Sequence, residues 1–458
     1  MDVLRPLAAS LLLLVGCGEN APAGADSPNI LFVFADDLGY GDLGVYGAAA
    51  IDTPNLDALA AGGVRMTQLY SGNAVCTPSR AVLLTGRSGG RQRLEGTVGG
   101  VYFPFTTGGM GQEQVTLAEV LREEGYRTAL VGKWHLGHEP IHLPTRQGFD
   151  RFFGLPYSND MLPLPVMEGE TELQEDLPEE EQAELQERYT ERIEAVMEEA
   201  HREGRPFFVY YATHAPHVPL VPSADFDGTS ARCAEAGAER ACGTYADVVA
   251  EMDSSVGRLV DKLRELGIED ETLVVFTSDN GPWLDKGMDA GSPGPFREGK
   301  GSTFEGGFRV PAIASWPGTL REGAVEAAPA VMYDWLPTLA AVAGADPPGD
   351  RAIDGQDLLP LLRGEGPRDP TGEPFELLYY RLDNETPGAY RRGRWKYKAP
   401  ATGGEAPYND YDHGELLFDL EADPGEQNDL SATHPERVTE LREAMEARHA
   451  ELTSDPLR

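Results

Sequence analysis

Ile30-Leu31-Phe32-Val33-Phe34-Ala35-Asp36-Asp37 is the stretch of sequence that decides the fold. A continuous apolar run of this length is typical of a parallel strand that is buried on both faces of a sheet. Three similar runs follow, at residues 127–131, 206–211 and 272–277. Helical patterns lie between these runs, and strands that alternate with helices predict a doubly wound α/β domain with a large mixed sheet flanked by helices.

Several of the predicted helices have recognisable ends. Thr116 and Glu119 have the spacing of a capping box, which satisfies free N–H groups at a helix start. The helical pattern from Tyr245 to Leu266 stops at Gly267, a residue that tolerates the left-handed conformation of a helix end. Within residues 168–203 apolar side chains recur at helical spacing among many acidic ones, which predicts a helix with one buried stripe and a solvated acidic face.

The pattern changes after about residue 365, and the sequence predicts two units. The first, residues 28–365, contains the α/β sheet. The second, residues 366–458, is predicted to be an α+β subdomain with a small antiparallel sheet and a terminal helix. Its strand candidates are 376–380, 395–398 and 415–420, and its helix candidate is 435–451.

Charge limits the classes of partner. The chain of 458 residues has 76 acidic and 38 basic residues, and its formal net charge is −38. This excludes a nucleic-acid-binding surface, because phosphate binding needs a basic face that releases counterions. It also disfavours an anionic membrane surface. An anionic substrate would therefore need a local pocket of positive charge.

The N-terminus is predicted to be a targeting segment. Residues 6–15 are small or apolar, too few to span a bilayer, and follow the basic Arg5. Leu14-Val15-Gly16-Cys17 resembles a bacterial lipobox, so residues 1–17 are interpreted as a lipoprotein-type signal peptide with Cys17 as the lipidated residue. An ordinary signal peptide with an incidental cysteine is the alternative. Residues 18–27 would be a flexible tether, and the mature protein would be exported to the bacterial periplasm or cell envelope, meeting the membrane only through the anchor.

The remaining cysteines differ in their surroundings. Cys233 and Cys242 flank a short loop with no zinc-type ligands nearby, and in an exported protein they predict a disulfide and not a metal site. That pairing leaves Cys76 without a partner. A lone cysteine in an exported protein calls for a chemical explanation.

Polar groups follow each predicted central strand. In open α/β sheets, ligands bind beyond the carboxyl ends of the strands, so these groups are expected at one edge. They are Asp36-Asp37, Lys133 with His135, His214 with His217, and Ser278-Asp279-Asn280.

Four of these residues form a candidate metal site. Asp36, Asp37, Asp279 and Asn280 offer hard oxygen ligands, which suit calcium or magnesium better than zinc. Calcium is favoured because it accepts irregular oxygen-rich shells, whereas magnesium demands near-octahedral geometry.

Cys76-Thr77-Pro78-Ser79-Arg80, continuing to Arg87, resembles the maturation signature of the type I sulfatases, which belong to the alkaline phosphatase superfamily. The segment 148–158 is especially similar to the arylsulfatase A branch of that family. Other runs resemble family motifs in the family's order. These are residues 36–42, 132–137, 277–281 and 299–307.

The resemblance implies that Cys76 is oxidised to formylglycine by a formylglycine-generating enzyme and that one Ca²⁺ is bound by Asp36, Asp37, Asp279, Asn280 and residue 76. It also implies roles for the surrounding side chains. Arg80 orients the hydrated aldehyde, Lys133 binds sulfate and the leaving oxygen, and His135 accepts a proton, being two residues from Lys133 in an extended segment. His217 protonates the leaving alcohol, Lys300 holds sulfate and Ser158 hydrogen-bonds it.

The function implied is hydrolysis of a sulfate monoester to alcohol and sulfate through a formylglycine-sulfate intermediate at position 76. The substrate would be a sulfated small molecule or glycan: aryl, sugar and lipid sulfates all stay open, and the segment 160–203 with the C-terminal subdomain is expected to wall the pocket. Two alternatives are a phosphodiester or phosphonate-ester hydrolase of the same superfamily and a non-catalytic surface lipoprotein that binds sulfated ligands.

Overall fold

The computed structural model describes residues 27–401 and 413–457. The predicted signal peptide with Cys17, and residues 18–26 of the predicted tether, lie outside this part of the chain. Within it, no helix is both long and apolar enough to cross a membrane.

The centre of the fold is a run of parallel strands. β1 (Asn29–Ala35) lies between β7 (Phe207–Ala212) and β8 (Thr272–Ser278), and β3 (Arg127–Lys133) pairs with β7 on its other side. All seven residues of β1 are buried, because helices cover both faces of the sheet. These strands are the ones predicted from the continuous apolar runs, and the predicted α/β class is confirmed.

Outer strands extend the sheet and make it mixed. In the described residues the sheet has 11 strands in the order β10-β2-β9-β8-β1-β7-β3-β4-β5-β6, with β11 beside β2. β9 (Arg309–Ser315) is antiparallel to both β8 and β2 (Val64–Tyr70), and neither β2 nor β9 was among the predicted strands. The other outer strands are β4 (Arg151–Leu155), β5 (Val166–Glu168), β6 (Thr171–Gln174), β10 (Ala324–Glu326) and β11 (Ala330–Val331).

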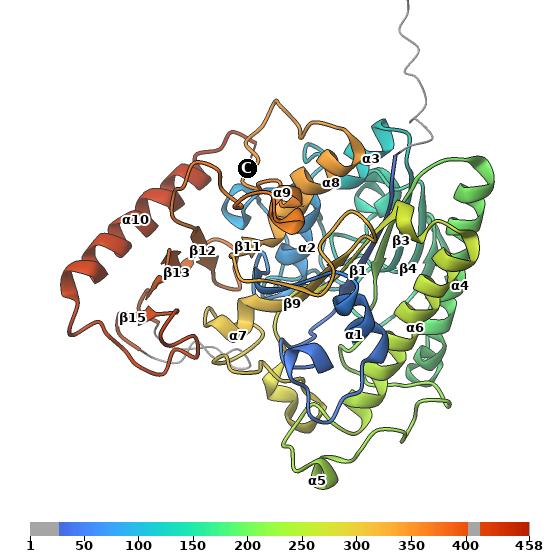
Figure 1. Cartoon of the computed structure of the whole chain (residues 1–458), viewed down its shortest axis with the longest axis horizontal. Coiled ribbons are helices and arrows are strands. Elements are labelled where there is room, and N and C mark those ends of the chain that lie inside the picture. The colour runs from blue at the N-terminus through green and yellow to red at the C-terminus, as the bar shows by residue number, and fades with distance from the viewer. Residues whose placement is uncertain (1–26, 402–412, 458) are drawn as a thin grey trace, which may run out of the picture.

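Helices pack on both faces of the sheet and form two separate cores (Figure 1). The capping box at Thr116 is present, and the helix α6 (Thr244–Leu266) ends at Gly267 as predicted. In the acidic helix α4 the apolar residues of the predicted stripe, Leu185 to Met197, are buried. One face carries α1 (Pro54–Ala61), α4 (Leu185–Glu203) and α6 (Thr244–Leu266), and the other carries α2 (Cys76–Thr85), α3 (Leu117–Glu123) and α8 (Trp335–Ala343).

The C-terminal part forms a second, smaller sheet, as predicted. It has four antiparallel strands among the described residues and a core shared with the terminal helix α10. β13 was not predicted, because Pro387 and Gly388 at its start are typical of a turn. The elements are β12 (Glu376–Tyr380), β13 (Pro387–Arg392), β14 (Trp395–Lys398), β15 (Leu416–Asp419) and α10 (Pro435–Thr453).

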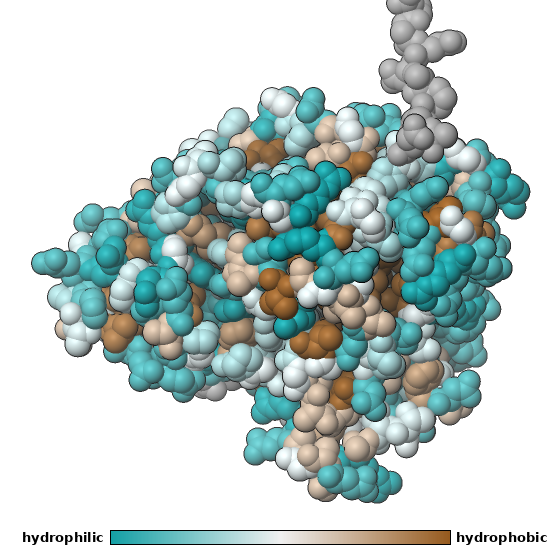
Figure 2. All heavy atoms as spheres, viewed as in Figure 1, coloured by the Kyte–Doolittle hydropathy of each residue, from teal (hydrophilic) through white to brown (hydrophobic). Residues whose placement is uncertain are grey.

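The hydrophilic surface and one disulfide agree with what the sequence indicated. The face seen in Figure 2 is mostly hydrophilic, with separate small hydrophobic patches. Cys233 and Cys242 are joined by a disulfide at the short helix α5 (Cys233–Ala236), with their Cα atoms 5.1 Å apart. The remaining short helices are α7 (Glu305–Phe308) and α9 (Leu359–Arg363).

Candidate active site

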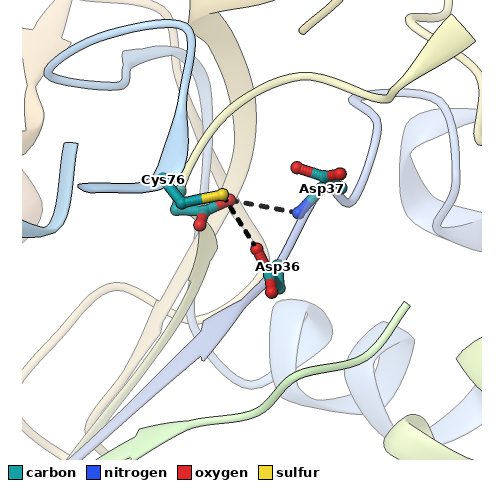
Figure 3. A group of neighbouring side chains, drawn as sticks. Asp36, Asp37 and Cys76 are labelled. Carbon is teal, nitrogen blue, oxygen red and sulfur yellow. Dashed lines mark hydrogen bonds between the residues drawn. The ribbon is translucent and has the colours of Figure 1, made fainter. Parts of the chain in front are cut away.

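The predicted polar groups converge at the carboxyl ends of the central strands. Asp36 and Asp37 follow β1, Asp279 and Asn280 follow β8, and Cys76 is the first residue of α2. One potential ligand atom each from Asp36, Asp37, Cys76 and Asp279 lies within 4.8 Å of the others. Figure 3 shows Asp36, Asp37 and Cys76 side by side, with the sulfur of Cys76 directed toward Asp36.

Hydrogen bonds hold these ligands in place. Cys76 Sγ lies 3.4 Å from Asp36 Oδ1, and the backbone N–H of Asp37 donates to Asp279 Oδ1 at 3.1 Å. Asn280 Nδ2 donates to Asp37 Oδ1 at 2.7 Å. Asn280 Oδ1 is buried with no hydrogen-bond partner among the described residues, so an acceptor is available at the site.

Three buried cations lie against the carboxylates. Lys133 Nζ is 2.6 Å from Asp36 Oδ2, and Lys300 Nζ is 2.7 Å from Asp37 Oδ2. Arg80, one turn along α2 from Cys76, places Nη2 2.8 Å from Asp279 Oδ2. With Asp36, Asp37 and Asp279 ionised, the three cations balance the three carboxylates, and this local balance contrasts with the strongly acidic chain as a whole.

Ser158 and His217 also contact the charged residues of the site. Lys133 Nζ donates to Ser158 Oγ at 3.0 Å, so Ser158 lies beside the ammonium group. His217 Nδ1 is 2.6 Å from the carbonyl oxygen of Val218, and since a carbonyl only accepts, Nδ1 carries the hydrogen. His217 Nε2 then faces the site, 3.5 Å from Asp37 Oδ2.

His135 differs from its predicted geometry. β3 ends at Lys133, and His135 has φ 61°, so the prediction of an extended segment through His135 is wrong. His135 Nε2 is 3.0 Å from the carbonyl oxygen of Tyr102 and therefore carries the hydrogen. Its Nδ1 is buried without a partner in the described part of the chain, which makes this atom a lone-pair acceptor.

Burial and the local charges shift the pKa of several groups in the site. Burial alone would raise the pKa of Asp36, but Lys133, His217 and Arg80 hold it well below its usual value. Burial and the charge of Asp36 raise the pKa of Asp279 to about 7. Burial raises the pKa of the Cys76 thiol well above its usual value, so the unmodified side chain is a poor nucleophile.

The residues present fit a calcium ion. Calcium takes oxygen ligands at about 2.3–2.6 Å, so ligands on opposite sides of one ion are separated by about 5 Å, close to the observed spread. The buried Asn280 Oδ1 offers an acceptor without a partner in the described structure, and burial together with the charges of Asp36 and Asp37 raises the pKa of Asp279. A divalent cation would coordinate the Asn280 oxygen and stabilise the ionised form of Asp279. Calcium prefers oxygen ligands of the kind that these side chains offer.

Several site residues were missed by the reasoning from sequence. The Tyr102 carbonyl orients His135 although 33 positions separate the two residues. Trp283 lies under the Lys300 ammonium, with 4.5 Å between Nζ and the ring centroid. Asp160 faces the same cations, and its position directly after Ser158 and Asn159 was a signal that could have identified it.

The fold and this site are those of an alkaline-phosphatase-like hydrolase, with a buried cluster of cations for an anion and a carboxylate cluster that fits a metal ion. The model of the sulfatase family matches residues 28–345, and the chain belongs to that family. It is a sulfuric ester hydrolase.

Known proteins agree with this assignment. The chain is 41% identical to arylsulfatase A from Bos taurus, over 92% of this chain and 87% of the relative. It is 37% identical to N-acetylgalactosamine-6-sulfatase from Canis lupus familiaris, over 96% and 89%. The structure of the PsFucS1 sulfatase from Pseudoalteromonas sp. superposes with a TM-score of 0.81 at 27% identity, covering 94% of this chain and 92% of that one. These relatives favour sulfate-ester hydrolysis over the phosphodiester alternative.

Proposed function

We propose that this sulfatase acts through a formylglycine made from Cys76 and one Ca²⁺ bound by Asp36, Asp37, Asp279, Asn280 and residue 76. The observation that carries the proposal is the position of Cys76, buried 3.4 Å from Asp36 within the carboxylate cluster. A thiol is a soft, poor ligand for calcium, and its raised pKa opposes ionisation. An oxygen-bearing residue at this position would complete the shell.

Hydrated formylglycine would supply one hydroxyl that attacks sulfur and a second whose deprotonation releases sulfate, and calcium would favour ionisation of the attacking hydroxyl. The chain's own residues bind and orient the ester. Lys133, Lys300 and Ser158 hold the sulfate oxygens, and the free N–H groups at the start of α2 add further donors. Arg80 fixes residue 76 through its contacts with Asp36 and Asp279.

The two histidines would move protons in opposite directions. His217 directs Nε2 into the site. In its imidazolium form both ring nitrogens carry a hydrogen, and Nε2 would give its proton to the oxygen of the leaving alcohol while Nδ1 keeps its bond to Val218. His135 has its Nδ1 lone pair available and would accept the proton whose removal triggers sulfate release. Burial, with Lys133 and Arg80, holds the pKa of His135 well below its usual value, which keeps the ring neutral and able to accept.

The test is turnover by protein produced together with a formylglycine-generating enzyme. We expect release of inorganic sulfate from an aryl sulfate, and a preference of at least about a hundredfold over an aryl phosphodiester. Both esters are monoanions, but the phosphodiester has two non-bridging oxygens in place of three and a second ester group, so its transition state has a different geometry. A reversed preference of that size would support the phosphodiester alternative. An unmodified Cys76 in protein from the native host would support a non-catalytic, ligand-binding role.

We propose that the protein is exported and anchored to the cell envelope through a lipid on Cys17. The support is the lipobox-like run at residues 14–17. Cys17→Ala should release the protein into the soluble fraction of the bacterial host and abolish incorporation of a labelled fatty acid. Retention of the variant in the membrane fraction would contradict the anchor.

A further inference from the structure

A pocket of about 370 Å³ opens directly beside the sulfate-binding residues. This volume falls within the range of about 300–1,000 Å³ that is typical of small-molecule sites. Part of its wall follows Ser158 in the chain, from Asn159 to Leu162, and part follows β6, from Asp176 to Gln182. Val218 and Pro219, which come directly after His217, close another side.

Several contacts connect this pocket to the active site. Asp160 accepts a hydrogen bond from Ser158, and its carboxylate lies within the field of Lys133 and Lys300. Lys286, at the rim, places its ammonium 3.9 Å from the centroid of the Trp283 ring, which Lys300 also contacts at 4.5 Å.

A narrow crevice of about 10 Å³ lies between residues of the active site and residues of this pocket. Asp37 and His217 line the crevice, and it shares Val218 and Lys286 with the larger pocket. Because Val218 lines both spaces and directly follows His217, the pocket lies close to the residue that would protonate the leaving alcohol.

The pocket wall is rich in hydrogen-bond acceptors. Asn159 is 1% exposed, and its Nδ2 donates to Gln182 Oε1 at 3.2 Å, which fixes the orientation of the amide. Asn159 Oδ1 is buried with no partner in the described structure, so the amide offers an acceptor that requires a donor.

The charges on the wall are mostly negative. Asp160, Asp176 and Glu179 contribute carboxylates, and Lys286 is the one cationic residue among the described residues that line the pocket. Leu162 and Pro219 add apolar surface. Carboxylates and an amide oxygen accept hydrogen bonds from hydroxyl and amide N–H groups, and apolar side chains pack against the C–H face of a ring.

We propose that this pocket binds the alcohol part of the ester as an uncharged, hydroxyl-bearing ring of monosaccharide size, and that it discriminates against a ring that carries a second anionic group. The inference rests on the proposed function, because the pocket is defined by its position beside the sulfate site. A second sulfate in the pocket would lie close to three carboxylates and one lysine, an arrangement that disfavours binding by like-charge repulsion.

The experiment compares three kinds of substrate on the formylglycine-containing holoenzyme. N-acetylhexosamine monosulfates, one for each ring position, identify the preferred sugar. Its counterpart with an N-sulfate in place of the N-acetyl group tests discrimination, and 4-nitrophenyl sulfate reports sulfate-ester cleavage without a sugar in the pocket. We expect kcat/KM for the preferred monosulfate to exceed that of the N-sulfated counterpart by about tenfold or more.

Variants assign this preference to the pocket. Glu179→Lys should reduce the discrimination between the two sugars by about tenfold, whereas the control Glu180→Lys, at an exposed neighbour that does not line the pocket, should leave it unchanged. Asp160→Asn should raise KM for the monosulfate by about tenfold relative to the aryl sulfate, because hydrogen bonds to a charged group are lost.

The outcomes distinguish a failure of the pocket assignment from a failure of the proposed function. If the enzyme cleaves 4-nitrophenyl sulfate but no sugar sulfate, or cleaves the N-sulfated sugar equally well, the pocket assignment is overturned and the sulfatase mechanism stands. If Glu179→Lys and Glu180→Lys change the discrimination equally, the assignment is also overturned. If no sulfate ester is cleaved by protein shown by mass to contain formylglycine, the proposed function itself fails.

Discussion

Cys76 Sγ lies 3.4 Å from Asp36 Oδ1, and both side chains are buried. The Asp36 carboxylate is paired on its other oxygen with Lys133 at 2.6 Å. A thiol in this position gains little as a nucleophile, since burial raises its pKa and the ammonium of Lys133 is already paired. The site is therefore suited to a different group at position 76, and this relationship leads to the first prediction.

Cys76→Ala should abolish turnover and leave the fold intact. Removing a nucleophile costs several orders of magnitude in kcat, and we expect a loss of at least about 10³-fold. The substitution removes one buried sulfur, so the unfolding temperature should change by only a few degrees. Sulfate release and thermal unfolding measure the two effects. A tenth of the wild-type activity in the variant would refute the assignment.

Intact mass provides an independent check on the same residue. Wild-type protein produced with a formylglycine-generating enzyme should be lighter than the same processed chain with an unmodified Cys76 by the difference between a cysteine and a formylglycine. Cys76→Ala should have the mass calculated for its own processed chain, and the Cys233–Cys242 disulfide provides an internal reference for the oxidation state of the other cysteines. A wild-type protein that keeps its thiol under these conditions would remove the proposed catalyst.

Asp279→Ala should lose calcium and activity together. Asp279 accepts from Arg80 and from the backbone of Asp37, and a missing carboxylate would lower the charge that holds the ion. Calcium at about 100 times its Kd stabilises a folded protein by about 2.7 kcal/mol, so wild-type protein should unfold at a higher temperature with calcium than after chelation. The variant should lack this shift. Full metal stoichiometry in the variant would show that the ligands are wrongly assigned.

Much of this architecture could be predicted from local sequence, and the rest depends on tertiary contacts. β1 was recognisable because its residues are all buried and its apolar run is unbroken. β2 alternates between buried and half-buried residues, and β9 contains Pro311, so neither has that pattern.

The same distinction applies to the site. Lys133, His217 and Asp279 lie in recognisable motifs at or beyond the carboxyl ends of strands β3, β7 and β8. The contact of His135 with the Tyr102 carbonyl arises only when two distant loops fold together. The orientation of the Asn159 amide is likewise fixed by a hydrogen bond to Gln182, which lies 23 positions away, and this orientation leaves the Asn159 oxygen without a partner among the described residues. The sequence indicated that the segment 160–203 would wall the substrate pocket, and residues from Asp160 to Gln182 do line the pocket described above, whereas the C-terminal subdomain contributes none of its described lining residues. The hydrogen bonds that shape the pocket could not be predicted, because they join residues far apart in the chain.

His217→Ala should affect substrates in proportion to the basicity of their leaving alcohol. General acid catalysis contributes about 10²–10⁴-fold, and it matters most when the departing oxygen is a strong base. We expect a loss of that size for a sugar sulfate and a much smaller loss for 4-nitrophenyl sulfate, whose leaving group is stable as an anion. Kinetics on both substrates test this. Equal losses would indicate that His217 positions the sulfate and does not protonate the alcohol. His201→Ala, on the exposed end of α4, is the control.

Glu305, five positions after Lys300, joins the active-site loop to the C-terminal sheet. It accepts from Tyr70 at 2.6 Å, from Tyr379 at 3.0 Å and from Lys396 at 2.9 Å. Burial alone would raise the pKa of Glu305, but Lys396 and neighbouring arginines lower it to about 2 from its ordinary 4.5. The charged form is therefore favoured in the folded state, and its ion pair with β14 is buried on both sides.

This lowered pKa predicts a specific loss of stability in acid. A carboxylate whose pKa is lower in the folded than in the unfolded protein contributes its full stabilisation at any pH above its unfolded-state pKa. This contribution is lost as the pH falls through the folded-state pKa. The free energy of unfolding should therefore decline by about 3 kcal/mol between pH 4.5 and about 2 on account of this group. Glu305→Gln should remove that part of the pH dependence and cost about 3 kcal/mol at neutral pH, because Lys396 loses one of its two buried carboxylate partners and keeps Glu426.

Denaturant unfolding at several pH values measures both effects, and a surface ion pair provides the matched control. Glu170 pairs with Arg146 at an exposed site, where water and salt screen the charges, so Glu170→Gln should leave the free energy of unfolding almost unchanged. If Glu305→Gln is as mild as this control, the buried pair does not stabilise the junction. The double variant Glu305→Gln with Lys396→Met should be less destabilised than the sum of the single variants, because Glu305 and Lys396 contact each other and their losses overlap. It keeps part of the cost of Lys396→Met, since Glu426, 2.9 Å from Lys396, stays buried without its lysine.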